Sequence, residues 1–410
     1  MQRLLPETAF IKSDIMFDGL RYTKALGDAA ATSAPNFYPY RFAQGEPDPT
    51  GTGKAAIPYL FTLEDGTLIR IKGNFKSPWH IEAGEGGRGH VLCRDGVPMR
   101  TIDFVKKPRW LEMQTSDGMS MAKTGAEALG DMLVINVAPG CQYFTNKDES
   151  GNSMRCTFCG YGRPDERMVA LGQKIDRTAL EPLTLTRMQE TIAAALDTEK
   201  VRHVYLVGGS LTNWQDEADR FLEMARAARK VVGHRAHLSL GSGAIPTPML
   251  EVFKKEDLVD GACFNLEVWG KQLFSTVCPG KQRYIGWEKW LESLYAAGKL
   301  FGRGNVYTAM VCGVELEPEH GGMSIDAAIA NALSGARELI RHDVIPLWSM
   351  YWPIWGMTHP ERLPALREYY ERFNFEYGKL RQELGVKISD QFQCRGCAYM
   401  QLEVDLDRTW

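Results

Sequence analysis

Six short apolar segments, each followed by an amphipathic helical segment, dominate the chain from residue 131 onward. Helices that alternate with buried strands are typical of a parallel sheet covered by helices. In the helical segment 214–232 the apolar residues recur at helical spacing and form one stripe of Phe221, Leu222, Ala225 and Ala228. The apolar segments are DMLVINVA (131–138), RHVYLVGG (202–209), RAHLSLGSG (235–243), GACFNLEVW (261–269), NVYTAMVCGVE (305–315) and VIPLWSMYW (344–352).

The number of units and the first turn favour a partial barrel over an open sheet. No Gly-x-Gly-x-x-Gly follows the first apolar segment, so the dinucleotide-binding type of open sheet is not indicated. We therefore predict an α/β fold, a partial (β/α)₆ barrel of the TIM type. Enzymes with such barrels carry their sites at the carboxyl ends of the strands.

The two ends of the chain differ from this pattern. Residues 1–130 are rich in Gly, Pro and short β-like runs, which predicts a small β-rich N-terminal domain or cap. We expect the barrel to span 131–360. Residues 361–410 are expected to form a C-terminal helix and a tail that contains cysteines.

The overall charge excludes some partners. The net charge is −3, so the chain has no global basic field that would attract nucleic acid or an anionic membrane surface. No segment has eighteen uninterrupted apolar residues, and the N-terminus lacks a secretory signal pattern. Nine scattered cysteines without such a signal indicate thiols or metal ligands in a reducing cytoplasm.

Three of the nine cysteines stand together after the first predicted strand. Cys141 is followed by fourteen residues and Cys156, and two more residues separate Cys156 from Cys159. Structural zinc needs four protein ligands, and a four-iron cluster also normally takes four thiolates. Three thiolates would leave one iron open to a small molecule. The alternatives are three unrelated thiols, or a zinc site completed by Cys394 and Cys397.

This Cys-x14-Cys-x2-Cys arrangement, with the aromatic Phe158 before the last cysteine, resembles the cluster motif of the radical S-adenosylmethionine (SAM) superfamily. The fourteen-residue spacing is longer than the three residues usual there, but the insert QYFTNKDESGNSMR is polar and turn-forming. The resemblance implies a [4Fe-4S] cluster on Cys141, Cys156 and Cys159. It also implies reductive cleavage of SAM to a 5′-deoxyadenosyl radical, and a low-potential electron donor of the flavodoxin or ferredoxin type.

The ends of the second and third strands fit the same resemblance. Gly208, Gly209 and Ser210 resemble the superfamily's Gly-Gly-Glu motif, which holds the SAM amino group, with Ser210 in place of the Glu. Ser242 follows the third strand between two glycines, whose bare backbones permit close approach of a ligand. An ordinary tight turn explains either glycine set equally well on its own.

The later strands resemble the biotin synthase-like group within the superfamily. By that resemblance Asn265 and Glu267 would lie over the SAM nucleoside, with Glu267 accepting hydrogen bonds from the ribose hydroxyls. Arg283 would pair with the SAM carboxylate, and Val314 would contact adenine through its backbone. Taken singly, each of these residues is better explained as a strand-end or surface residue, but their order along the chain is not expected by chance.

Three tryptophans and a second pair of cysteines have open interpretations. The tryptophans of the sixth strand region either wall an apolar substrate cavity or belong to the barrel core; they are Trp348, Trp352 and Trp355. The pair Cys394 and Cys397 suits a second iron–sulfur cluster, zinc, a redox pair or a rigid turn. Further ligands for such a site would come from Cys93, Cys278, Cys312 or His80. Cys263 lies in an apolar strand and is expected to pack in the core.

We therefore expect a cytoplasmic, oxygen-sensitive radical SAM enzyme that abstracts hydrogen from a small organic substrate in a biosynthetic pathway. Two alternatives remain: a radical SAM enzyme that modifies tRNA or a peptide, and a zinc-bound structural or partner-binding protein. The weak charge bias does not favour a nucleic acid substrate. The fate of the substrate radical is open among rearrangement, C–C cleavage, and methyl or sulfur transfer.

Overall fold

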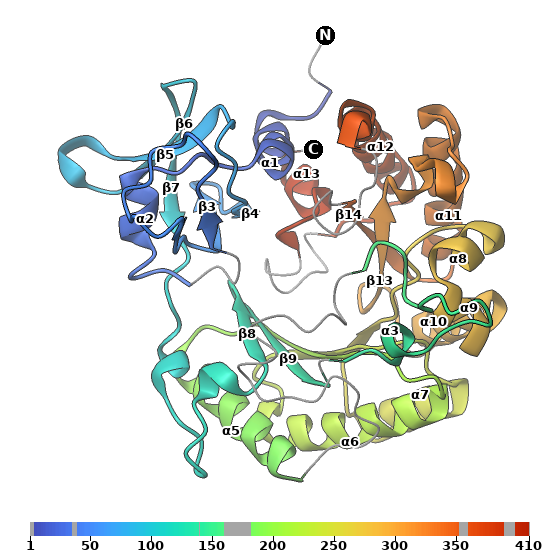
Figure 1. Cartoon of the computed structure of the whole chain (residues 1–410). Helices are drawn as coiled ribbons and strands as arrows, with labels where there is room; N and C mark the ends of the chain where they lie inside the picture. Colours follow the sequence, from blue (N-terminus) through green and yellow to red (C-terminus); the bar gives the residue numbers. More distant parts are fainter. Residues whose placement is uncertain are drawn as a thin grey trace.

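A curved seven-stranded sheet organises the larger part of the protein, and helices cover its outer side (Figure 1). The computed structural model describes residues 4–34, 39–138, 140–159, 182–351, 360–388 and 398–409. The strand order is β14-β13-β12-β11-β10-β9-β8. Its strands are β8 (Ala126–Leu129), β9 (Met132–Ala138), β10 (His203–Gly208), β11 (His237–Gly241), β12 (Gly261–Cys263), β13 (Val306–Cys312) and β14 (Ile345–Met350).

Six of these strands are parallel and lie in chain order, as a barrel requires. Only β8 runs antiparallel, against β9 at one edge. The fold class is therefore an α/β partial barrel of the TIM type, as predicted. The helices that cover the sheet are α5 (Pro182–Thr198), α6 (Trp214–Val232), α7 (Thr247–Lys255), α8 (Lys271–Val277), α9 (Pro279–Tyr284), α10 (Trp287–Phe301), α11 (Ile325–Arg341) and α12 (Leu363–Glu383).

Helix α6 illustrates how the sequence specifies these elements. Its first turn is capped by the side chain of Asn213, which accepts a hydrogen bond from the Gln215 amide. Acidic residues stand in its first turn and basic residues in its last, each favourable to the helix dipole. The predicted stripe holds in part: Phe221, Ala225 and Ala228 are buried, and Leu222 is only half-buried.

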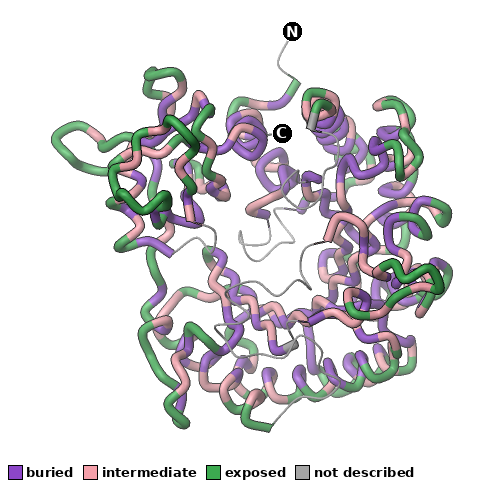
Figure 2. The backbone as a smooth tube through the Cα atoms, viewed as in Figure 1, coloured by how far each residue is buried: buried purple, intermediate pink, exposed green. Residues whose placement is uncertain are grey.

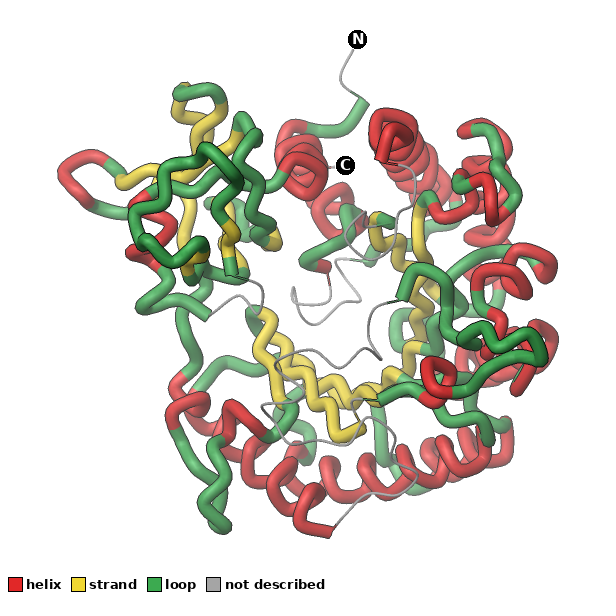
Figure 3. Tube along the Cα trace, in the orientation of Figure 1, coloured by secondary structure: helices red, strands yellow, loops and turns green. Residues whose placement is uncertain are grey.

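The helices lie on the outer side of the curved sheet, and the strands line its inside (Figures 2 and 3). In β13 every second residue is buried, from Val306 to Cys312, and the residues between are half-buried. This alternation is the two-residue period of a strand whose faces have different surroundings. The half-buried face of the sheet is the concave one, so polar groups on it have room to meet a ligand.

The N-terminal part forms a separate antiparallel sheet of order β4-β3-β7-β6-β5. Its strands are β3 (Leu60–Leu63), β4 (Leu68–Arg70), β5 (Trp79–Ala83), β6 (His90–Arg94) and β7 (Val97–Phe104). A short pair, β1 (Tyr40–Arg41) and β2 (Lys54–Ala55), and the helix α2 (Lys24–Ala29) accompany it. This sheet agrees with the predicted β-rich N-terminal region. The predicted boundary at residue 130 stays a prediction. The strand β8, which ends just before that residue, already pairs with β9 in the large sheet.

Helix α1 (Glu7–Asp18) packs against β4 of the N-terminal sheet and also against α13 (Glu403–Thr409) (Figure 1). Lys12 of α1 is completely buried, and its Nζ lies 2.6 Å from Asp405 in α13. Arg367 of α12 forms ion pairs with Asp14 and Asp18. A buried ammonium group needs such a partner, so α1 and α13 depend on each other. No helix in the described part of the chain is long and apolar enough to span a bilayer.

Candidate functional site

The three clustered cysteines lie at the carboxyl edge of the parallel sheet, where barrel enzymes carry their sites. Cys141 directly precedes the short helix α3 (Gln142–Thr145) and stands three residues beyond Ala138, where β9 ends. Cys156 and Cys159 come after the polar insert, and the Cys159 amide donates to the Cys156 carbonyl at 3.0 Å. Cys156 is buried, whereas Cys141 and Cys159 are half-buried. The loop that carries all three thiols therefore begins at the carboxyl end of β9, which is the predicted edge of the sheet.

The glycine loop after β10 lies in close contact with the backbone at Cys141. A Cβ atom at Gly209 would lie 1.6 Å from the Gly140 carbonyl oxygen and 2.7 Å from the Cys141 amide nitrogen. The neighbouring Ser210 carbonyl accepts a hydrogen bond from the Gln142 amide at 2.9 Å. Only a residue without a side chain permits this approach. The Gly208–Ser210 segment therefore positions the start of the cysteine loop.

Helix α6 ties the loops after β10 and β11 together through one buried carboxylate. Glu217 accepts from the Leu211 amide at 2.9 Å through Oε2, and from the Gly243 amide at 2.6 Å through Oε1. Burial raises the pKa of Glu217, while Arg220 and the two amides lower it. Two amide donors on one buried carboxylate form charge-assisted hydrogen bonds, which are stronger than neutral ones.

Arg220 and Ser242 complete this part of the edge. The Arg220 guanidinium, one turn along α6 from Glu217, donates at 2.5 Å to the carbonyl of Gly209. Ser242 is buried, and its hydroxyl donates to the Gly243 carbonyl at 2.8 Å. The Ser242 hydroxyl thus orders its own loop. Whether it also contacts a cofactor stays a prediction.

The cysteine loop docks on the segment that joins α8 and α9. The Thr157 amide donates to the Val277 carbonyl, and the Gly280 amide donates to the Met154 carbonyl, both at 2.9 Å. A Cβ at Gly280 would lie 2.5 Å from the Met154 carbonyl oxygen. The insert between Cys141 and Cys156 therefore loops out, as predicted, while both of its ends are anchored.

A fourth cysteine lies beside the buried one. Cys278 is completely buried. A hydrogen bond with Cys278 and then burial raise the pKa of the Cys156 thiol well above its usual value. Burial likewise raises the pKa of Cys141 to about 12, with a smaller contribution from Cys156. These thiols therefore keep their protons unless a cation binds, because thiolates in such surroundings require a compensating positive charge.

A buried ion pair lies next to these thiols. Lys281 Nζ is 2.7 Å from Glu267 Oε1, with side chains 8% and 13% exposed, and it also donates to the Asn265 carbonyl at 2.5 Å. Burial lowers the pKa of Lys281, but Glu267 and then Cys156 and Cys278 raise it beyond its ordinary value. Glu267 has a φ of +74°, in the left-handed region that non-glycine residues rarely adopt. Such backbone conformations concentrate at functional sites.

The remaining predicted cofactor residues differ in how far they are buried. Phe158 is half-buried against the core beside the cysteines, and Val314 is completely buried in a short 3₁₀ turn after β13. Arg283 is exposed; hydrogen bonds from Asn152 and, to a smaller extent, the charge of Arg283 lower the pKa of Asp148 in the insert. The structure thus brings Glu267 to Lys281 and leaves Arg283 at the surface. The predicted contacts with SAM stay predictions.

Trp348 packs in the core, one of its two predicted alternatives. It is 2% exposed, and its ring lies edge-on to Phe373 of α12 at 4.6 Å between centroids. Its amide donates to Glu403 at 2.7 Å. Trp352 and Trp355 lie outside the described residues, as do Cys394 and Cys397.

Among the described residues, no group of three or more His, Cys, Asp and Glu side chains is arranged to hold a metal ion. The three thiols are of the kind that binds a four-iron cluster and lie on one loop, and two of them, Cys141 and Cys156, interact electrostatically. The glycine at position 209 permits the close backbone approach at Cys141. The assignment of Cys141, Cys156 and Cys159 as cluster ligands stays a prediction.

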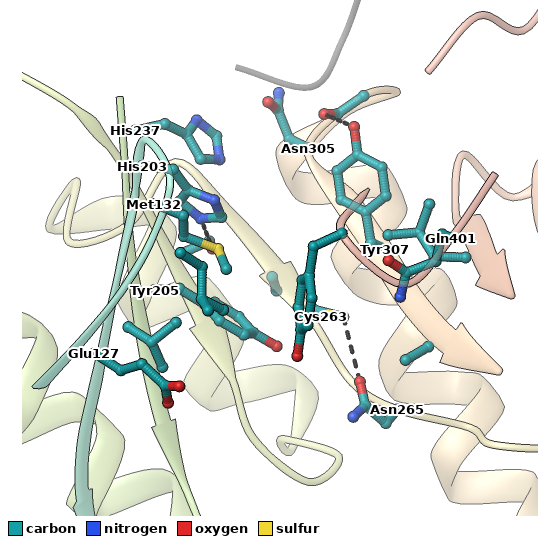
Figure 4. A pocket seen from close by; sticks show the side chains of 18 residues that line it. Glu127, Met132, His203, Tyr205, His237, Cys263, Asn265, Asn305, Tyr307 and Gln401 are labelled. Atoms are coloured by element: carbon teal, nitrogen blue, oxygen red, sulfur yellow. Dashed lines mark hydrogen bonds between the residues drawn. The ribbon is translucent and has the colours of Figure 1, made fainter. Parts of the chain in front are cut away.

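A cavity of about 350 Å³ lies on the concave side of the sheet, toward the amino ends of the strands (Figure 4). Its walls come from every second residue of β9, β10, β11 and β13, as the strand period requires. Cys263 lines this cavity, and its Sγ donates to Asn265 Oδ1 at 3.3 Å. Cys263 was expected to pack in the core. It is half-buried instead, because β12 turns it to the concave face.

Sequence reasoning missed Glu217 and Lys281, and it considered Cys278 only as a partner of Cys394 and Cys397. Lys281 stands only two positions from the predicted Arg283, but two helical steps turn a side chain by about 200°, to the other side of α9. Glu217 had a detectable signal, since it shares the apolar stripe with Phe221 at a spacing of four. The contact between Cys278 and Cys156 could not be predicted, because the two residues are 122 positions apart in the sequence.

The chain was compared with protein-family models, curated proteins and solved structures. No protein-family model matches the chain, and no curated protein matches it. Among solved structures, the chain is similar to a radical SAM methyltransferase from Sphaerobacter thermophilus. The two share 13% sequence identity with a TM-score of 0.36, over 73% of this chain and 76% of that one. A likeness at this level assigns neither an activity nor a substrate.

Proposed function

We propose that the chain is a radical SAM enzyme that binds one [4Fe-4S] cluster through Cys141, Cys156 and Cys159 and acts on a small organic substrate. One observation supports this most. The three-thiol loop follows the first parallel strand of a partial barrel and meets the glycine loop of the second strand through backbone contact. When bound, such a cluster supplies the electron that cleaves the sulfonium bond of SAM. A low-potential flavodoxin or ferredoxin would deliver that electron.

The chain's own residues have definable tasks in this proposal. Gly209 lets the second loop reach the Cys141 backbone, and Glu217 holds that loop against the next one. Lys281 places a positive charge beside Cys156, which lowers the cost of its thiolate. Glu267 fixes the Lys281 ammonium and is itself held in an unusual backbone conformation.

The test begins with anaerobic purification and measurement of iron and sulfide. The expected result is about four of each per chain, and 5′-deoxyadenosine on reduction with dithionite in the presence of SAM. Cys156→Ala is expected to abolish both the cluster and the nucleoside. Cys93→Ala, a change of a buried thiol in the N-terminal sheet, is the matched control and should retain them. Nucleoside formation that persists in Cys156→Ala would contradict the ligand assignment.

One observation favours a second candidate, a closed metal site with four thiolates. Cys278 is in hydrogen-bonding contact with Cys156 and would complete such a site with Cys141 and Cys159. A closed tetrahedral site suits structural zinc and leaves no position for SAM. Cys278→Ser separates the two candidates. If three thiolates hold a cluster, the Cys278→Ser variant keeps four irons and forms 5′-deoxyadenosine. If four thiolates hold zinc, the wild type contains zinc and the Cys278→Ser variant does not.

A further inference from the structure

The cavity on the concave side has features that the proposed cluster site does not use. None of Cys141, Cys156 and Cys159 lines it. Its walls are contributed by all seven strands of the large sheet and by the segment before α13, through Tyr399 and Gln401. Its volume, about 350 Å³, falls in the range of sites that hold small molecules.

Gln401 presents a buried acceptor without a donor. The residue is 8% exposed, and its Nε2 donates to Ser349 Oγ at 2.7 Å. Its Oε1 has no hydrogen-bond partner among the described residues. A buried acceptor left in this way costs about 1–3 kcal/mol. A ligand with an N–H or O–H group in the cavity would supply the missing donor.

The opposite wall offers hydrogen-bonding groups from β10 and β11 (Figure 4). His203 Nε2 and Ser239 Oγ are hydrogen bonded at 2.5 Å, and the His237 ring lies edge-on to His203 at 5.3 Å. Burial and then His203 lower the pKa of His237 to about 4, so this imidazole is neutral near pH 7. Among the described lining residues there is no Lys or Arg, and Glu127 is the one acid.

We infer that this cavity binds a small planar molecule that carries no negative charge and donates a hydrogen bond to Gln401 Oε1. The flat rings of Tyr205 and Tyr307 suit a planar ligand. An anion would enter a low-dielectric space with no described cationic side chain to pair with it, beside the carboxylate of Glu127. The site is independent of the proposed cluster and goes beyond the proposed function.

The first experiment compares two probes of the same shape on the purified full-length protein. Indole-3-acetamide is uncharged and donates hydrogen bonds, whereas indole-3-acetate is an anion at pH 7.5. In isothermal titration calorimetry the amide is expected to bind at least tenfold more tightly than the acid. Equal or tighter binding of the acid would overturn the inference, as would absence of amide binding at millimolar concentration.

Variants then locate the bound probe. Gln401→Leu removes the acceptor and should weaken amide binding about tenfold, whereas Gln189→Leu on α5 makes the same change outside the cavity and should not. Ala309→Leu fills the space from β13 and should abolish binding while the chain stays folded by circular dichroism. Amide binding in Ala309→Leu as tight as in the wild type would place the probe elsewhere. Neither reductant nor SAM is present, so this result and the deoxyadenosine result can fail separately.

Discussion

The ammonium of Lys281 and the carboxylate of Glu267 form an ion pair at 2.7 Å inside the protein, between helix α9 and the segment after β12. The pair holds a glutamate whose φ is +74° and places a positive charge beside Cys156. The same ammonium lies 4.6 Å from the ring centre of Trp290. Backbone strain, a buried charge pair and a candidate ligand are therefore combined in one place.

Replacement of Lys281 by Met should strongly destabilise the protein. The methionine keeps the aliphatic stem but leaves the Glu267 carboxylate buried without its partner, which costs about 3–5 kcal/mol. Urea unfolding measures the change. The double variant Lys281→Met with Glu267→Gln should recover much of the loss, because no uncompensated charge remains.

The control for this prediction is a pair with the same chemistry at the surface. Lys271 and Glu288 are 2.5 Å apart, with side chains 61% and 66% exposed. Lys271→Met should leave the unfolding midpoint unchanged, because water screens exposed pairs. Equal losses in the two single variants would show that burial does not govern the Lys281 pair.

Glu217→Gln should loosen the two loops that the carboxylate holds. The amide side chain has one acceptor oxygen, so either the Leu211 or the Gly243 amide loses its partner. The expected loss is about 1–3 kcal/mol in urea unfolding, with weaker SAM binding in equilibrium dialysis. Glu223→Gln, at an exposed position of the same helix, should change neither.

Gly209→Ala should displace the Cys141 backbone, because the new Cβ would lie 1.6 Å from the Gly140 carbonyl oxygen. We expect less iron per chain after anaerobic purification and a lower unfolding midpoint. Gly385→Ala is the comparison: φ there is +65° and no atom lies within 4 Å of the added carbon. That change should cost about 1 kcal/mol from the backbone alone and leave the iron content intact.

The stability of the protein should fall as the pH drops from about 6.5 toward 4, in part because of His237. Burial lowers its folded-state pKa to about 4, below the ordinary value of 6.5, so the unfolded chain takes up the proton first. The contribution of His237 is therefore complete above pH 6.5 and is lost on acidification, by up to about 3 kcal/mol. Unfolding curves of His237→Gln should show a flatter pH dependence in this window. His234→Gln, at an exposed position, should follow the wild type.

The sequence allowed prediction of the six parallel strands, because buried strands and amphipathic helices each show a characteristic spacing of apolar residues within a short segment. It also allowed prediction of the edge at which Cys141 lies, since strand direction fixes that. It could not reveal that Cys278 meets Cys156 or that Gln401 reaches the concave cavity. Those contacts join residues far apart in the chain, and no local pattern encodes them.

The burial of Lys12 against Asp405 has a consequence for biosynthesis. The two residues are 393 positions apart, so a ribosome must synthesise all of the residues between them before this lysine can reach its counter-ion. Until then α1 lacks the carboxylate that its buried ammonium requires, and only the synthesis of α13 completes the surroundings of α1.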